Sequence, residues 1–258
     1  MQQKIIVPNS LKLIIIIRPI VLKLHKDIKG KHHITHKKEF SGSPVRQELI
    51  LKSVEFADRM ISSSSHRCHR SGGSHQRDEN EIFINTFQGK LAEYVVQDTL
   101  KSKNIECSEP DNVDYGKHVW DDFDLKVKGR SISVKSMSFF SNLLLLEKKD
   151  YNYLGEYRHH QSEDYEFIIV ARFKPDIKKL LSRRDKLESL KNRIVKMELE
   201  FDIPGVCSKK TIAYIVKRGY ILERGAFIGN NTIMDADNYY IQLGNMPSLG
   251  KLLSVFEN

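Results

Sequence analysis

The residues with the clearest potential for chemistry lie in one short stretch, residues 120–137. Asp122 and Asp124 precede a glycine in this stretch, and Ser133 and Lys135 follow it. A carboxylate can hold a hard divalent cation through oxygen. An ammonium can stabilise charge on a phosphate or help to position an attacking water. These residue types predict a site for metal-assisted hydrolysis, and the alternative is a cross-strand ion pair on a solvated sheet face.

The same stretch has the alternation that is typical of two half-buried strands. A glycine followed by any residue suits the first position of a type II′ hairpin turn, so we expect a two-residue loop at Gly129-Arg130. That loop sets Asp124 opposite Lys135, with Ser133 on the same polar face, and directly opposed Cβ atoms are about 4.5–5.5 Å apart. The predicted apolar face holds Phe123, Leu125, Val127, Ile132 and Val134.

A long helix is predicted before the hairpin, over residues 78–103, with Asp78 or Asn80 as its N-cap. Glu93 lies at the border of an apolar stripe on this helix, and Gly89 can let another element approach closely. A partly buried carboxylate has to be paired or bound to a metal. Glu93 is therefore a candidate ligand, unless it points to solvent from the edge of the stripe.

The remaining patterns predict an α/β (α+β) fold, in which a mixed central β-sheet is flanked by helices. The apolar run at 139–146 is typical of a central strand buried on both faces, and residues 166–172 predict another. The expected helices cover residues 45–61, 176–197 and 248–256, and further strands are expected at 212–216, 220–222 and 238–243.

The N-terminal region differs in composition from the rest of the chain. We expect a basic strand and helix segment with a polar loop at 1–77, followed by a domain with a C-terminal extension at 78–258, and one continuous domain is the alternative. The apolar run at 11–17 is too short to span a bilayer, so we expect a buried strand and no membrane partner. The histidines at 25–36 and 66–75 lack the ligand spacing of a zinc site. A basic arm or a disordered tail is expected for the first group, and a mobile loop near DNA for the second.

The charge balance favours a polyanionic partner, because the formal net charge is +9 and the isoelectric point is near 9.3. Nucleic acid is the first candidate. The three cysteines are widely separated and odd in number, which predicts the reducing cytoplasm, here a prokaryotic cytoplasm or nucleoid. The residues expected to contact DNA are Arg67, Arg70, Arg77, Lys90, Arg183 and Arg184.

Three short segments together resemble the PD-(D/E)XK nuclease superfamily, and within it the restriction-endonuclease-like proteins. The segments are residues 87–93, 122–125 and 132–135, and the resemblance covers about residues 80–172. It implies a mixed sheet flanked by helices, with Mg²⁺ held between an Asp on one strand and an (Asp/Glu)-x-Lys motif on the next. It assigns Asp124 and Lys135 to these positions. Asp122 shares a strand face with Asp124 and is the reserve metal ligand.

The sequence departs from the family pattern at Ser133, where the family usually has a carboxylate. Serine is a poor Mg²⁺ ligand, so a second carboxylate has to come from elsewhere. Glu93 on the preceding helix is the first choice, and Glu147 after the apolar run is the second. The resemblance thus implies one or two Mg²⁺ ions per site, with Asp124, Glu93, Ser133 and Lys135 as catalytic residues.

The function that these observations predict is a Mg²⁺-dependent endonuclease, most simply a type II restriction enzyme that cuts double-stranded DNA. Cleavage of both strands at one sequence would favour a two-fold homodimer. Two alternatives stay open on the sequence. One is a structure-selective nuclease of DNA repair or recombination, and the other is a nucleic-acid-binding protein without catalysis.

Overall fold

The structure is a computed structural model that describes residues 21–62, 78–110, 124–158, 164–180, 185–230 and 232–256. Several predicted features lie outside these ranges. They are the strand at 11–17, the metal ligand Asp122, and the DNA contacts Arg67, Arg70, Arg77, Arg183 and Arg184.

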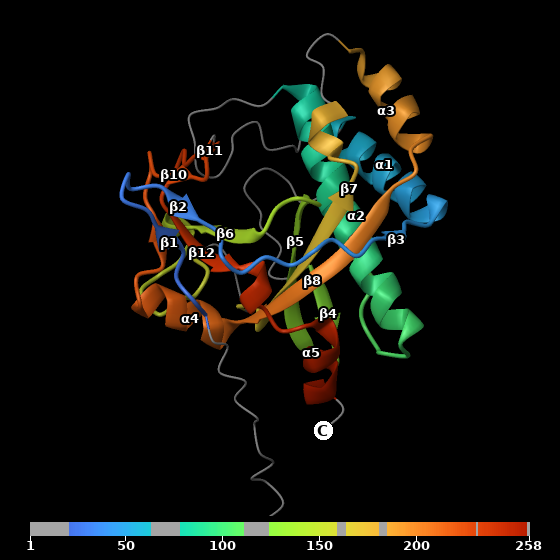
Figure 1. Cartoon of the computed structure of the whole chain (residues 1–258). Helices are drawn as coiled ribbons and strands as arrows, with labels where there is room; N and C mark the ends of the chain where they lie inside the picture. The colour runs from blue at the N-terminus through green and yellow to red at the C-terminus, as the bar shows by residue number, and fades with distance from the viewer. Residues whose placement is uncertain are drawn as a thin grey trace, which may run out of the picture.

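The centre of the fold is a five-stranded mixed sheet with the order β3-β8-β7-β5-β4 (Figure 1). Neighbouring strands β5 and β7 run parallel, and the other pairs run antiparallel. The strands are β3 (Ser43–Pro44), β4 (Leu125–Val127), β5 (Arg130–Ser138), β7 (Phe167–Lys174) and β8 (Glu200–Ser208). The predicted class, a mixed sheet with helices, is confirmed.

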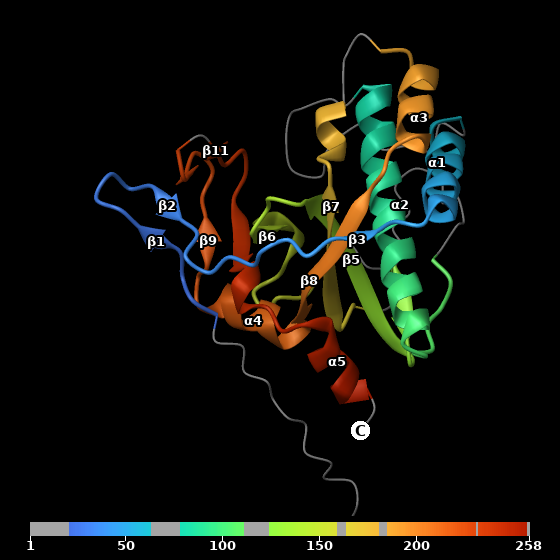
Figure 2. The ribbon, with the colours of Figure 1, turned by 45° about the vertical axis from the view of Figure 1, so that its right-hand side comes forward.

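Helices cover one face of this sheet (Figure 2). They are α1 (Gln47–Ser62), α2 (Glu79–Ser102), α3 (Leu187–Val195) and α5 (Leu249–Phe256). The sheet contributes Ile132 and Val134 of β5 and Ile169 of β7 to this core, and α2 contributes Phe87 and Leu91. Burial of these side chains contributes about 1.5–3 kcal/mol each, so it fixes which face of β5 points toward the helices.

Helix α2 forms where the sequence predicts it. Asp78 is the N-cap and accepts a hydrogen bond from the backbone N–H of Glu81 at 2.8 Å. This bond satisfies one of the free amides of the first turn. The helix is buried on two sides, since it packs against both α1 and the central sheet. The predicted helix at 45–61 is confirmed as well, as α1.

A second, smaller layer covers the opposite face of the central sheet. It consists of a three-stranded sheet with the order β6-β12-β9 and of helix α4. The bounds are β6 (Leu143–Glu147), β9 (Ile221–Leu222), β12 (Asn238–Gln242) and α4 (Lys209–Lys217). Ile168 and Val170 of β7 are fully buried in this second core. Strand β7 is therefore buried on both faces, as predicted for 166–172.

A third sheet stands at the edge of the molecule and consists of two short hairpins with the order β1-β2-β10-β11 (Figure 2). The bounds are β1 (His25–Lys26), β2 (His32–His33), β10 (Phe227–Ile228) and β11 (Thr232–Ile233). Residues 21–40 are thus ordered in a hairpin and a following extended segment, and the expectation of a disordered tail is wrong for them. Short 3₁₀ helices complete the fold at Lys148–Asp150, Ile177–Leu180 and Leu243–Asn245.

Two buried polar side chains fasten the N-terminal segment to the body of the fold. The Gln242 amide accepts from the backbone of Thr35 and His36 and donates to the carbonyls of Leu22 and Lys23. Arg172 donates to the carbonyls of residues 38 and 39. Helix α1 also packs on α2, and β3 pairs with β8. The described part of the N-terminal region therefore shares its cores with the rest of the chain.

Three predicted elements are corrected. The run at 139–146 is not a central strand, because β6 begins at Leu143 and lies at the edge of the small sheet, with Phe140 55% exposed. Residues 212–216 belong to helix α4, where Ile212 and Ile215 lie one turn apart and Ser208 caps the N-terminus. Short apolar runs fit either a strand or a buried helix.

The third correction concerns the long basic helix predicted at 176–197. In the structure a 3₁₀ turn at Ile177–Leu180 and helix α3 at Leu187–Val195 replace it, with residues 181–184 outside the described part. The predicted strand at 238–243 and helix at 248–256 are confirmed as β12 and α5. Among the described residues, no helix is both long and apolar enough to cross a membrane.

Candidate active site

The hairpin β4–β5 carries the predicted site, but its turn differs from the prediction. Lys128 and Gly129 are the two turn residues, with φ values of 46° and 78°. Positive φ at both positions is the requirement of a type I′ turn. The pairs are Leu125–Ile132 and Lys126–Ser131. The expected loop at Gly129-Arg130 is wrong, and the register is shifted by two residues, so Asp124 comes level with Ser133 instead of Lys135.

Asp124 is held firmly across the two strands. Its backbone N–H donates to the carbonyl of Ile132 at 2.9 Å. Its Oδ2 accepts from the N–H of Val134 at 2.5 Å and from the Ser133 hydroxyl at 3.1 Å. These contacts fix the direction of the carboxylate, and among the described residues no donor is found for Oδ1. Ser133 is itself buried. Its hydroxyl donates to Asp124 and so helps to fix the direction of the carboxylate.

Lys135 lies two residues beyond Ser133 and shares its face of β5, because side chains alternate along a strand. The side chain is half-buried. Among the described residues no hydrogen bond or ion pair involves its ammonium group, and Asp124 does not form a salt bridge with it. The alternative interpretation, a cross-strand ion pair, therefore does not describe this hairpin. Asp124 and Lys135 are therefore diagonal neighbours across the two strands, and such positions are about 7–8 Å apart.

Glu93 forms an ion pair with a lysine of its own helix. Its Oε2 accepts from the ammonium of Lys90 at 2.6 Å, and the two side chains are 14% and 6% exposed. The same ammonium lies 4.2 Å from the ring centroid of Phe56 in α1. This pair therefore stands at the contact between α1 and α2. A Cβ on Gly89 would meet nothing within 4 Å, so the predicted close approach at Gly89 is not found.

The burial of Lys90 also bears on its predicted role as a DNA contact. A DNA-binding lysine has to present its ammonium to phosphates, but this one is enclosed by Glu93 and Phe56. The structure leaves no accessible ammonium at Lys90 for a phosphate. It forms an ion pair with the largely buried carboxylate of Glu93.

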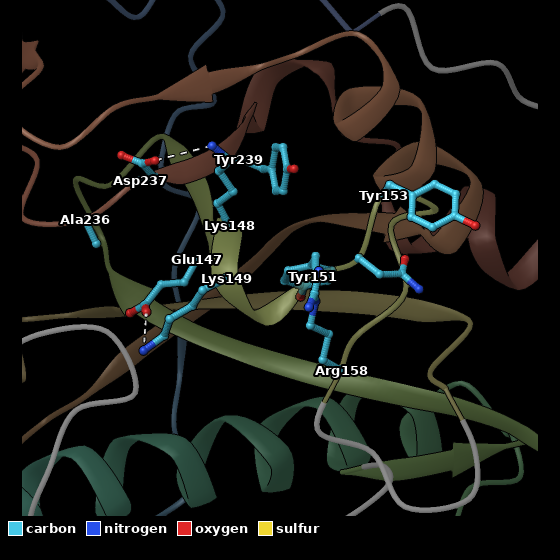
Figure 3. A pocket seen from close by; sticks show the side chains of 10 residues that line it. Glu147, Lys148, Lys149, Tyr151, Tyr153, Arg158, Ala236, Asp237 and Tyr239 are labelled. Atoms are coloured by element: carbon cyan, nitrogen blue, oxygen red, sulfur yellow. Dashed lines mark hydrogen bonds and ion pairs between the residues drawn. The ribbon is translucent and has the colours of Figure 1, made fainter.

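Glu147 lines a separate cleft of about 560 Å³, and Figure 3 shows its side chain pointing toward Lys149. Their charged atoms are 3.7 Å apart. The lining of this cleft is mainly basic and aromatic, and includes Lys148, Tyr151, Tyr153, Arg158 and Tyr239. None of Asp124, Ser133 and Lys135 lines it.

The three predicted metal ligands in the described part of the chain, Asp124, Glu93 and Glu147, do not form one group. Within the described residues, no group of three His, Cys, Asp or Glu side chains could hold a metal ion. Asp124 is thus the one predicted ligand at the hairpin face whose placement is known, and Asp122 lies outside the described part. Mg²⁺ is often held by one or two carboxylates together with substrate phosphates. The fixed Asp124 carboxylate, with Oδ1 unengaged, fits that limited role.

Sequence reasoning missed the backbone group that orients the site. The Val134 amide donates to Asp124 just beyond the Leu125–Ile132 pair, where β4 begins. No residue type signals this contact. Arg158 and Tyr153, both exposed at the cleft of Figure 3, were also missed, because they lie in a loop without periodicity.

Comparison with known proteins gives no relative for this chain. No family model, no curated protein and no solved structure matches it. The class that the fold defines is a mixed α/β protein with three layers.

Proposed function

We propose that the chain is an endonuclease that hydrolyses phosphodiester bonds in double-stranded DNA, with a restriction-endonuclease-like fold. The observation that carries the proposal is the polar face of the β4–β5 hairpin. A fixed carboxylate, Asp124, directly precedes β4, and an ammonium without an ion-pair partner among the described residues, Lys135, stands on β5. The helix before the hairpin and the net charge of +9 agree with it.

The roles of the residues follow from their contacts. Val134 and Ser133 hold Asp124 so that its second oxygen can accept a ligand. Lys135 offers its ammonium to the charge that develops on the phosphate, which is where a preorganised cation has its largest effect. The groups need no rearrangement before the reaction, because neither is engaged in a competing ion pair with another described residue.

The metal enters this proposal through Asp124. A bound Mg²⁺ would supply an activated water and neutralise charge on the phosphate oxygens. Asp122 is the candidate for a second carboxylate, since it precedes Asp124 by two positions in the sequence. Glu93 is a weaker candidate than Asp122, because Lys90 already neutralises it.

Cleavage at one sequence on both strands would favour a two-fold homodimer, and a type II restriction enzyme in a prokaryotic cytoplasm is the specific role that we propose. A structure-selective repair nuclease would use the same site chemistry. It would differ by preferring branched DNA over plasmid and by giving no discrete fragments.

A second candidate, a nucleic-acid-binding protein without catalysis, has one observation in its favour. The described residues contain no group of three potential metal ligands. An endonuclease and a binding protein predict opposite results when Mg²⁺ is added to a complex with DNA, so one experiment separates them.

The experiment is a plasmid digest with Mg²⁺, run beside a chelator control and the variant Asp124→Asn. We expect cleavage by the wild type only when Mg²⁺ is present. Asp124→Asn keeps an oxygen that can accept the Val134 and Ser133 hydrogen bonds, so the fold should persist while cleavage is lost. Wild-type cleavage by a folded Asp124→Asn protein would refute the site, and binding without any cleavage would favour the second candidate.

A further inference from the structure

The hairpin β1–β2 ends in a turn that is locked by one carboxylate. We call residues 25–33 the basic arm. Asp27 Oδ1 accepts from the backbone N–H groups of Lys29 and Lys31, both at 2.9 Å. Asp27 Oδ2 lies 2.8 Å from Nε2 of His33. Gly30 supplies the positive φ, +80°, that closes the turn. The tip of the arm is therefore held in one conformation.

Ile28 stands at the tip of the basic arm with a relative exposure of 103%. It is as exposed as an isolated residue, so it contributes nothing to either core. Single exposed apolar side chains are common and need no explanation by themselves. This one differs because it stands on a hydrogen-bonded turn whose sequence places Lys26 before it and Lys29 and Lys31 after it.

The base of the arm is braced against the neighbouring hairpin. His32 of β2 pairs with Ile228 of β10, and the N–H of Gly229 donates to the His32 carbonyl at 2.8 Å. The ammonium of Lys31 lies 6.0 Å from the ring centroid of Phe227. Figures 1 and 2 both show the arm projecting from the end of the molecule opposite α1. The arm is thus a preorganised projection.

We propose that the basic arm inserts Ile28 between two base pairs of duplex DNA, with Lys26, Lys29 and Lys31 on the flanking phosphates. Apolar wedges of this kind, isoleucine among them, partly unstack a base step and kink the duplex by about 20–90°. The lysines provide the sequence-independent attraction to phosphate. The inference rests on DNA as the substrate of the proposed function, but it does not use the Asp124–Lys135 site.

The charge and size of the arm favour DNA over a membrane surface. Binding to the lipid interface scales with the apolar area that is buried, and interfacial elements present a whole apolar face. Ile28 is a single side chain on a short turn, flanked by polar residues. A base step needs only one wedge, so a single isoleucine suffices there.

The test measures binding, unstacking and bending in chelator, where no cleavage occurs. A duplex carries 2-aminopurine at successive steps and a dye pair at its ends. We expect the wild type to raise 2-aminopurine fluorescence at one step and to shorten the end-to-end distance. Ile28→Ala should abolish both signals while binding weakens only about tenfold, as removal of one buried aliphatic side chain predicts.

Matched variants separate the wedge from general effects. Leu51→Ala removes an exposed aliphatic side chain from α1, and it should unstack and bend DNA as the wild type does. Replacing Lys26, Lys29 and Lys31 by Gln should reduce the slope of log K against log[salt] by about 0.9 for each phosphate that the protein no longer neutralises. Anionic vesicles without DNA are the competing partner, and we expect no binding to them that depends on Ile28.

The outcomes distinguish this inference from the proposed nuclease. If Ile28→Ala unstacks and bends DNA as the wild type does, the wedge is refuted even though the protein cuts DNA. Vesicle binding that is absent in Ile28→Ala, without DNA unstacking, overturns the choice of partner. If the wild type bends DNA but never cuts it with Mg²⁺, the wedge stands and the nuclease proposal fails.

Discussion

Lys135 is the residue on which the proposed chemistry depends most directly. Its ammonium shares a sheet face with Asp124 and Ser133, and no carboxylate of the described residues pairs with it. We expect Lys135→Ala to fold normally and to bind DNA, because it removes no core volume. The cleavage rate should fall by a factor on the order of 10²–10³, as on removal of one preorganised donor.

The matched control is Lys174→Ala, at the end of β7, which removes an exposed lysine paired with Glu200 at 3.4 Å. It should cut plasmid at the wild-type rate. The assays are initial cleavage rates in Mg²⁺ and thermal melting of each variant. A folded Lys135→Ala protein with the wild-type rate would remove Lys135 from the site.

The sequence pattern predicts Glu93 as a metal ligand. Its ion pair with Lys90 predicts a structural role instead. Both side chains are largely buried, and removing one partner of such a pair leaves an uncompensated charge, which costs about 3–5 kcal/mol. Glu93→Gln should therefore lower the free energy of unfolding by a few kcal/mol. The folded fraction should keep its cleavage rate.

Chemical denaturation and single-turnover cleavage at a temperature where the variant is folded check this prediction. The double change Lys90→Met with Glu93→Gln should recover part of the stability, since no charge is then left buried. Loss of cleavage in fully folded Glu93→Gln would indicate that Glu93 is a metal ligand. The same loss in Glu147→Gln would indicate Glu147 as that ligand.

At the scale of single elements, strands β7 and β8 offer two ion pairs that differ mainly in burial. Arg172 is fully buried and forms an ion pair with Asp202, whose Oδ2 lies 2.6 Å from the guanidinium. The second pair, Lys174 and Glu200, is about half exposed. The Arg172 guanidinium also lies 5.6 Å from the ring centroid of Phe40. The buried pair therefore ties the segment after the basic arm to the central sheet.

We expect Asp202→Asn to lower the free energy of unfolding by about 3–5 kcal/mol, because Arg172 would keep a buried and poorly compensated charge. Glu200→Gln in the neighbouring exposed pair should cost about 0–1 kcal/mol. Urea denaturation of the two variants measures the difference. Equal losses in both variants would contradict the burial argument.

The turn of the basic arm makes a prediction about pH. The hydrogen bond with His33, followed by the backbone N–H of Lys31, lowers the pKa of Asp27 from 3.8 to about 2. A carboxyl group whose pKa is lower in the folded protein stabilises it above the unfolded pKa. This contribution is present above about pH 4 and is lost as the pH falls from 3.8 through about 2.

An NMR titration of the Asp27 side chain should therefore have its midpoint near pH 2. In His33→Ala the midpoint should move up toward 3.8, because the largest cause of the lowered pKa is removed. A wild-type midpoint at the ordinary value would mean that the turn is not locked in solution, and it would weaken the wedge proposal.

For the whole molecule, the charge balance predicts how DNA binding depends on salt. The net charge is +9, and each neutralised phosphate contributes about −0.9 to the slope of log K against log[salt]. We expect a steep decrease of affinity between low and high salt, measured by fluorescence anisotropy in chelator. A slope near zero would remove DNA as the partner.

The layers explain why local patterns predicted some elements and not others. Helix α2 and strand β7 carry their own signals, an Asp78 cap with apolar stripes and a run buried on both faces. Helix α4 and strand β6 are short apolar runs, and such runs take the conformation that the neighbouring layer requires. Strand β6 pairs with β12, which is distant in sequence, and α4 packs against β12 and β8. These contacts decide where the two elements lie.

The sequence by itself determined the polar and apolar faces of β4–β5, because side chains alternate along a strand whatever its partner is. It also determined the charge, the long helix and the residue types of the site. Only the tertiary structure decided which residues face each other. The type I′ turn at Lys128-Gly129 set Asp124 level with Ser133, and the packing of α1 on α2 gave Glu93 a buried lysine. Register and ion pairing depend on backbone dihedrals and on distant neighbours, which the local pattern does not encode.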